Sequence, residues 1–83
     1  MTLEALMQAE KRTIGAKQTE KAVLRNMTEL VFLAKDADER VTVNLAELCK
    51  EQNVQVVMVD SKADLGKACG IRVKAAAAAV LKS

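Results

Sequence analysis

The chain of 83 residues contains no tryptophan, tyrosine, histidine or proline, and Phe32 is its single aromatic residue. RNA-binding domains that stack bases need exposed aromatic rings. Any contact with nucleic acid would therefore depend on charge, base edges and aliphatic side chains. Without histidine, and with Cys49 and Cys69 not forming a closely spaced pair, the zinc-binding patterns are also missing. We expect no metal and no cofactor.

The sequence also lacks the patterns that are typical of enzymes. The commonest general base, histidine, is absent, and no nucleophilic side chain is paired with an evident base. Phosphate-loop and dinucleotide-binding signatures are missing as well. We therefore expect a protein that is not an enzyme.

Long apolar runs and targeting signals are absent too. No stretch has about twenty uncharged apolar residues, so no membrane-spanning helix is expected. The first residues carry two acids and no basic segment, unlike a secretion signal. Both cysteines have apolar neighbours, which indicates small buried thiols in a reducing compartment. We expect a cytoplasmic protein without a membrane partner.

The residues that are present favour one small domain with an uneven charge distribution. A chain of this length holds one core, so residues 1–83 are expected to form a single domain. Its net charge is only +2, but residues 11–25 carry +4, residues 62–74 carry +3 and residues 36–60 carry −4. Solvated helix faces would account for this separation. A basic binding surface would require the two positive segments to meet in space.

Helical and strand-like patterns alternate along the chain. Helices are expected over residues 3–11, 16–26, 39–52 and 61–70, and strands over residues 12–15, 30–34 and 54–59. Asp36 or Asp38 can cap the third helix, and Ser61 and Asp64 have the spacing of a capping box. Such alternation predicts an α/β domain with helices on both faces of a small sheet.

Two of these helices carry further information. In the second helix, Ala16, Val23, Leu24 and Met27 are expected on the buried side. Lys17, Lys21 and Arg25 are spaced four apart and form one exposed column. In the fourth helix, a glycine at position 66 lowers the stability of the helix by roughly 1 kcal/mol relative to alanine. A glycine at this cost suggests that another part of the backbone approaches closely.

The five alanines at 75–79 allow two interpretations. Alanine is the best helix former, which favours a helix. However, few residues follow, and a helix that short is marginal in isolation. As a strand, alanines would let two helical layers pack closely, so the residues alone leave both structures open.

Three segments together resemble a known family. They are IGAKQTEKAV at 14–23, LVFLAKDAD at 30–38 and DLGKACGI at 64–71. In this order and spacing, the chain is similar over residues 11–81 to the kink-turn-binding ribosomal proteins. This family comprises the large-subunit proteins called seven-Ae and thirty-e and their short bacterial relatives.

The resemblance implies a fold, a partner and a site. The family fold is a three-layer α/β/α sandwich with a mixed four-stranded sheet, in which the alanine run is an interior strand. The family binds kink-turns, which are sharply bent elements of structured RNA, whether ribosomal RNA, riboswitch or another non-coding RNA, and we expect a monomer. The implied RNA-binding residues are Gly15, Ala16, Lys17, Gln18, Lys21, Lys35, Asp36, Ile71, Arg72, Val73 and Lys74.

One departure concerns base preference. Archaeal members have Asn-Glu where this chain has Lys17 and Gln18, whereas the thirty-e and bacterial members share the Lys-Gln form. The archaeal carboxylate only accepts hydrogen bonds, while the Gln18 amide accepts and donates. The base preference at the G·A pairs of a kink-turn is therefore open.

The chemistry of the implied site can be considered without the family. A helix that starts at Gly15 would present free N–H groups and a partial positive charge to an RNA backbone, or it is simply an amphipathic helix after a turn. Ile71 and Val73 would cover base or sugar surface while Arg72 and Lys74 meet phosphates, or both apolar side chains turn inward. An adaptor for proteins, with the acidic residues 36–51 as its contact face, is the alternative function.

Overall fold

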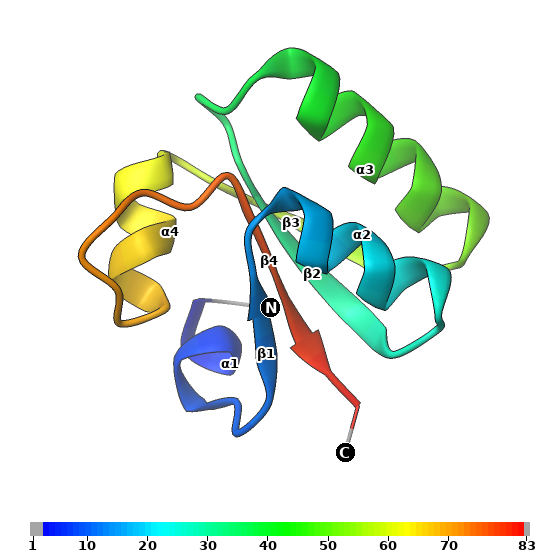
Figure 1. The fold of residues 1–83 in the computed structure, drawn as a ribbon, viewed down its shortest axis with the longest axis horizontal. Coiled ribbons are helices and arrows are strands. Elements are labelled where there is room, and N and C mark those ends of the chain that lie inside the picture. Colours follow the sequence, from blue (N-terminus) through cyan, green and yellow to red (C-terminus); the bar gives the residue numbers. More distant parts are fainter. Residues whose placement is uncertain (1–2, 83) are drawn as a thin grey trace.

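The computed structural model describes residues 3–82, which form alternating helices and strands (Figure 1). The predicted alternation is confirmed. In chain order the elements are α1 (Leu3–Gln8), β1 (Arg12–Ile14), α2 (Ala16–Leu24), β2 (Thr28–Ala34), α3 (Glu39–Glu51), β3 (Gln55–Val59), α4 (Lys62–Ala68) and β4 (Ala77–Leu81).

The four strands form one mixed sheet in the order β1-β4-β2-β3. Strand β4 is antiparallel to both of its neighbours, whereas β2 and β3 are parallel. The carboxyl ends of β1, β2 and β3 consequently meet the amino end of β4 at one edge of the sheet. Because α2, α3 and α4 each follow one of those three strands, all three helices begin at this edge. We call it the helix-start edge.

Helices cover both faces of the sheet, as the sandwich architecture requires. Helices α1 and α4 lie on one face and α2 and α3 on the other (Figure 1). Strand β2 serves both cores, because Phe32 points into the α1/α4 side while Val31 and Leu33 point into the α2/α3 side. The predicted three-layer α/β/α sandwich with a mixed four-stranded sheet is confirmed.

The alanine run is largely an interior strand, in agreement with the resemblance. Ala77, Ala78 and Ala79 are 0% exposed, and β4 is hydrogen-bonded to strands on both sides. Ala78 faces the α1/α4 core, while Ala77 and Ala79 face the α2/α3 core. Their methyl groups allow close packing of both helical layers on the centre of the sheet. Tertiary packing therefore overrides the helical propensity of alanine.

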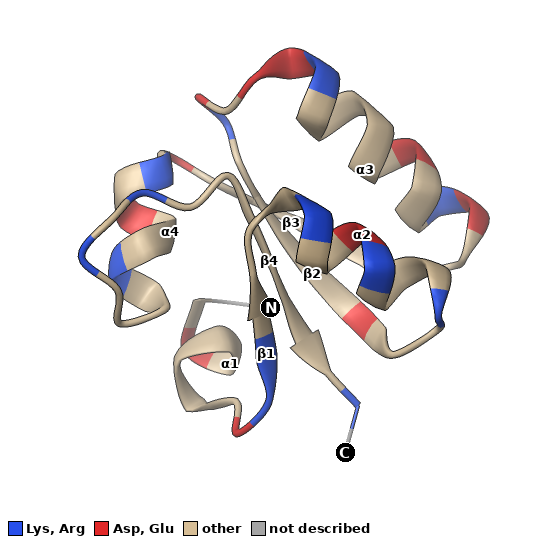
Figure 2. Cartoon of the chain, viewed as in Figure 1, with Lys and Arg blue, Asp and Glu red and all other residues tan. Residues whose placement is uncertain are grey.

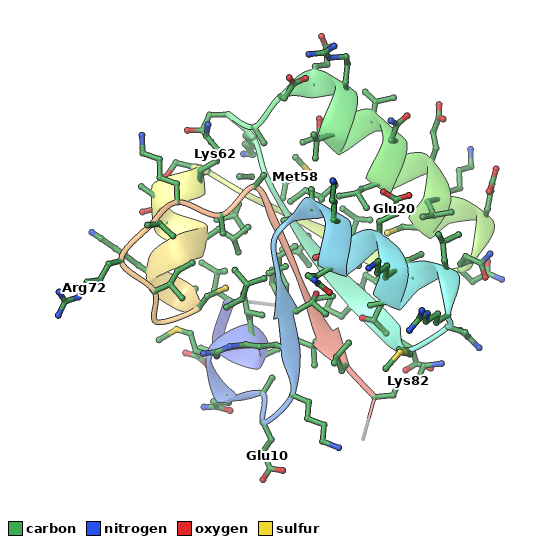
Figure 3. All side chains as sticks on the ribbon, viewed as in Figure 1. Glu10, Glu20, Met58, Lys62, Arg72 and Lys82 are labelled. Carbon is green, nitrogen blue, oxygen red and sulfur yellow. The ribbon has the colours of Figure 1, made fainter. Side chains whose placement is uncertain are left out.

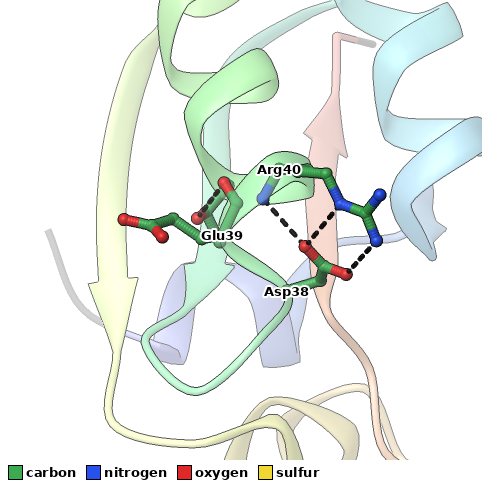
Figure 4. A network of polar contacts seen from close by, with 4 residues as sticks. Asp38, Glu39 and Arg40 are labelled. Carbon is green, nitrogen blue, oxygen red and sulfur yellow. Dashed lines mark hydrogen bonds and ion pairs between the residues drawn. The ribbon is translucent and has the colours of Figure 1, made fainter.

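The helix caps agree with the sequence signals. The Asp38 carboxylate accepts the Arg40 backbone N–H at 2.9 Å and pairs with its guanidinium at 3.2 Å (Figure 4). The side-chain and backbone hydrogen bonds from Arg40 lower the pKa of Asp38. The Ser61 hydroxyl accepts the Asp64 N–H at 3.0 Å, as the capping box predicts. These caps fix where α3 and α4 begin.

Two details of the prediction are wrong. Leu24 and Met27 were expected on the buried side of the second helix but are 55% and 44% exposed. The helix ends at Leu24, and Asn26 takes a positive φ of 56°, so the chain turns before Met27 could continue the stripe. The buried stripe is Thr19, Ala22 and Val23 instead. The first helix ends at Gln8, not near Lys11.

The cysteines are as expected from their apolar neighbours. Cys49 and Cys69 are buried free thiols. Burial raises the pKa of both, so the neutral thiol is the favoured form at each position. They contribute to the two cores as small apolar groups.

Candidate nucleic-acid interface

Gly15 joins β1 to α2 at the helix-start edge. Its φ of 104° lies in a region that side chains disfavour, so the turn requires glycine. Its N–H donates to the Ala77 carbonyl at 2.8 Å, which fixes the start of α2 to the start of β4. Within residues 3–82, no side chain caps this end of α2, and a Cβ at Gly15 would meet nothing within 4 Å. The first amides of α2, at Ala16, Lys17 and Gln18, have no hydrogen-bond partner among the described residues and carry a partial positive charge.

The predicted basic column on α2 is exposed. Lys17, Lys21 and Arg25 are all solvent-exposed, and within residues 3–82 none of them takes part in an ion pair. Figure 2 shows basic segments in blue on α2, next to an acidic segment in red. Glu20 lines a hollow with Asn44 and Leu48 of α3, so it lies on the side of α2 that faces α3. The outer side of α2 is therefore positive.

The second predicted segment, residues 71–74, is a loop that runs back along α4 from its last turn to its first. Gly70 reverses the chain with a φ of 74°. The Ile71 N–H then donates to the Gly66 carbonyl at 3.1 Å, and the Ala75 N–H donates to the Lys62 carbonyl at 3.1 Å. Because Lys62 begins α4, the loop ends at the helix-start edge.

The two apolar side chains of this 71–74 loop differ in orientation. Ile71 is half-buried and packs on the α1/α4 core, whereas Val73 is 70% exposed. Neither initial interpretation holds for both residues: one side chain turns inward and the other outward. Arg72 and Lys74 are exposed on either side of Val73. The loop thus presents one apolar side chain between two cations.

The start of α2 and the end of the 71–74 loop meet at the same edge. The chain passes from Lys74 through two alanines to Ala77, whose carbonyl binds the Gly15 N–H. The Ala34 N–H donates to the Ala76 carbonyl at 3.0 Å, which brings Lys35 to this edge as well. Arg72 is more distant, because it projects from the side of α4 that faces away from α2 (Figure 3).

Two predicted residues are engaged within the protein. The Asp36 carboxylate accepts the Lys62 N–H at 2.7 Å, so it caps the first turn of α4. Lys35 pairs with Asp60 at 3.4 Å, and both side chains are largely exposed. Asp36 therefore holds α4 in place at the helix-start edge, while the exposed Lys35 ammonium stays accessible to an anion.

One residue near the loop escaped the sequence analysis. Arg12 in β1 donates from its two terminal nitrogens to the Leu6 carbonyl at 3.0 Å and the Cys69 carbonyl at 2.7 Å. These acceptors lie near the carboxyl ends of α1 and α4. Nothing in the sequence pattern signals this contact, because Arg12 and Cys69 are brought together only by the fold.

Metal-binding clusters and membrane-spanning helices are both absent from the described residues. In residues 3–82, no group of three or more cysteine and acidic side chains could hold a metal ion. Among the same residues, no helix is both long and apolar enough to cross a membrane.

The chain is similar in sequence and fold to several known proteins. The model of the "Ribosomal protein L7Ae/L30e/S12e/Gadd45 family" matches residues 1–83. An "RNA-binding protein" of Bacillus pumilus is 43% identical over 98% of this chain and 99% of its own length. The "RNA-binding protein YbxF" of Geobacillus stearothermophilus is 43% identical over 99% of this chain and 100% of its own length. The solved structure of a Giardia lamblia 15.5kD RNA binding protein has a TM-score of 0.87 and 32% identity, covering 98% of this chain and 71% of that one.

Proposed function

The chain belongs to the ribosomal protein L7Ae/L30e/S12e/Gadd45 family, and from this premise we propose that it is a non-catalytic RNA-binding protein that recognises kink-turns. Relatives that align over nearly its whole length are named RNA-binding proteins. The finer assignment, to a bent RNA element, is supported by the shape and charge of the helix-start edge.

The observation that carries the proposal is the junction at Gly15 and Ala77. It brings an uncapped helix start with two free lysines to the same edge as a loop with an exposed valine and an exposed lysine. Phosphates bind well at such a helix start, because backbone N–H groups, the helix dipole and lysine ammoniums act together. Lys17 and Lys21 would meet phosphates on one side of the bend.

The 71–74 loop supplies the complementary contact. At a sharp bend, bases unstack and expose apolar surface. The exposed Val73 side chain would cover such surface, while Lys74 meets a neighbouring phosphate. Gln18 is exposed near the helix start and can both accept and donate hydrogen bonds to base edges. Aliphatic contact therefore takes the place of the aromatic stacking that this sequence cannot provide.

This arrangement would favour the bent RNA over the straight one. A straight duplex can touch the cations of α2, but it has no unstacked base to place against Val73. The protein would thus bind the bent form more tightly and shift the RNA toward it by that difference in affinity. Its role would be to stabilise the folded form of an RNA that contains a kink-turn.

Equilibrium binding to two RNAs tests the proposal. One RNA contains a kink-turn, and the other is a fully paired duplex of equal length and charge, both titrated at the same salt concentration. We expect tighter binding to the kink-turn by at least roughly tenfold, or about 1.4 kcal/mol. Equal affinities would leave only non-specific RNA binding, and no binding to either RNA would remove the RNA assignment altogether.

A further inference from the structure

We propose that Arg12 and Gly66 are positioning residues for the 71–74 loop: they hold it in one shape before RNA arrives, and selectivity for bent RNA depends on them although neither contacts the RNA. This inference rests on the proposed function. It concerns residues of β1 and α4 that were not among the expected RNA contacts.

Gly66 lets the loop lie directly on α4. A Cβ at this position would overlap the carbonyl oxygen of Val73 and approach the carbonyl carbon of Val73 at 3.2 Å and the Cα of Lys74 at 3.4 Å. All of these atoms belong to the backbone, so no side-chain rotation relieves the overlap. The close approach that the sequence suggested is thus confirmed. The position of Val73 therefore depends on the missing side chain of Gly66.

Gly66 also anchors the loop through its own backbone. Its carbonyl accepts the Ile71 N–H at 3.1 Å, one residue after the chain reverses at Gly70. The Ala75 N–H is bound to the Lys62 carbonyl one turn earlier in α4. The loop is consequently fixed to α4 near its start and at its end, with the Val73 backbone pressed on Gly66 between them.

Arg12 fixes the point where the loop leaves α4. Its guanidinium binds the Cys69 carbonyl at 2.7 Å and the Leu6 carbonyl at 3.0 Å, and it lies 3.8 Å from where a Cβ of Gly70 would be. Carbonyls at helix carboxyl ends carry partial negative charge, which a cation stabilises. Arginine can reach two separate acceptors from one planar group, whereas the lysine ammonium is a single point.

Holding the loop in this way has a specific consequence for binding. A loop that is already ordered loses little conformational freedom when RNA binds, so its contacts contribute more fully to affinity. If the loop shifts, Arg72 and Lys74 keep their charges, but Val73 no longer stands at the helix-start edge in the right place. Non-specific attraction to RNA would survive, and preference for the bent form would fall.

The experiment compares the wild type with three variants on the same two RNAs, the kink-turn and the straight duplex. Gly66→Ala moves the Val73 backbone, and Arg12→Lys keeps the charge but loses one of the two carbonyl contacts. Leu45→Ala serves as the control, because Leu45 is buried on the opposite face of the sheet in α3. Circular dichroism at the assay temperature establishes that each variant is folded.

We expect Gly66→Ala and Arg12→Lys to lower the ratio of the two affinities by roughly tenfold while binding to the straight duplex stays within about twofold of wild type. Leu45→Ala should lower the melting temperature and leave the ratio unchanged. An unchanged ratio in folded Gly66→Ala and Arg12→Lys would overturn the inference, as would an equal fall in Leu45→Ala. If Gly66→Ala does not fold, the affinity ratio of Arg12→Lys alone tests the inference. A wild type without selectivity would instead overturn the proposed function.

Discussion

Lys17 and Lys21 are the residues whose role in the proposed interface is easiest to isolate. They leave α2 one turn apart, both are exposed, and neither takes part in an ion pair within residues 3–82. Removing either ammonium should therefore change little inside the protein. Any effect on RNA binding would report directly on phosphate contact.

Salt dependence measures that contact. For Lys17→Ala and Lys21→Ala, we expect the slope of log affinity against log salt concentration to become shallower by about one in each case, because one fewer counterion is released. Lys50→Ala is the matched control, since Lys50 is exposed in the last turn of α3, at the opposite edge of the sheet. Unchanged slopes for both α2 variants would place these lysines outside the interface.

Single residues also show where sequence reasoning ends. The exposed column on α2 and the need for glycine at position 66 could be predicted, because helical spacing and helix propensity are local properties. The capping of α4 by Asp36 could not, since the carboxylate and the Lys62 N–H belong to different elements. The same holds for Arg12, whose acceptors come from two helices that meet only in the folded chain.

Among the elements, β4 gives the sharpest contrast between local preference and packing. Valine has a higher strand propensity than alanine, so propensity alone predicts that valine would stabilise this strand. Ala78, however, is 0% exposed, lies between Ile14 and Phe32 in the sheet, and faces the α1/α4 core. There is little room for two further methyl groups.

We accordingly expect Ala78→Val to lower the free energy of unfolding by about 1–3 kcal/mol, the usual cost of overpacking a core. Ala46→Val, at an exposed position of α3, should cost less than about 0.7 kcal/mol, the range of helix propensity alone. Urea unfolding of both variants measures the difference. A stabilised Ala78→Val would mean that the centre of the sheet has unfilled space.

The elements themselves could largely be predicted from the sequence, with errors at their ends. Apolar runs identified β2 and β3, and caps identified the starts of α3 and α4. The end of α2 was predicted too late, because Leu24 and Met27 continue the helical spacing although Asn26 has already turned the chain. That the alanine run forms a strand could be predicted only with the family resemblance, because a run of alanines by itself favours a helix.

For the whole molecule, sheet topology decides whether a binding surface exists. With β4 antiparallel between β1 and β2, the start of α2 and the end of the 71–74 loop are brought to one edge. The sequence showed two basic segments far apart along the chain, but their meeting depends on strand order, which composition and periodicity do not encode. We propose that these two segments bind one RNA together.

Backbone amide NMR of the isotope-labelled protein, titrated with kink-turn RNA, tests this claim most directly. We predict that amide resonances of residues 15–18 and 71–74 shift together with the same dependence on RNA concentration, while those of the last turns of α3, at the opposite edge of the sheet, stay in place. Changes centred on α3, or confined to one of the two segments, would contradict the shared surface.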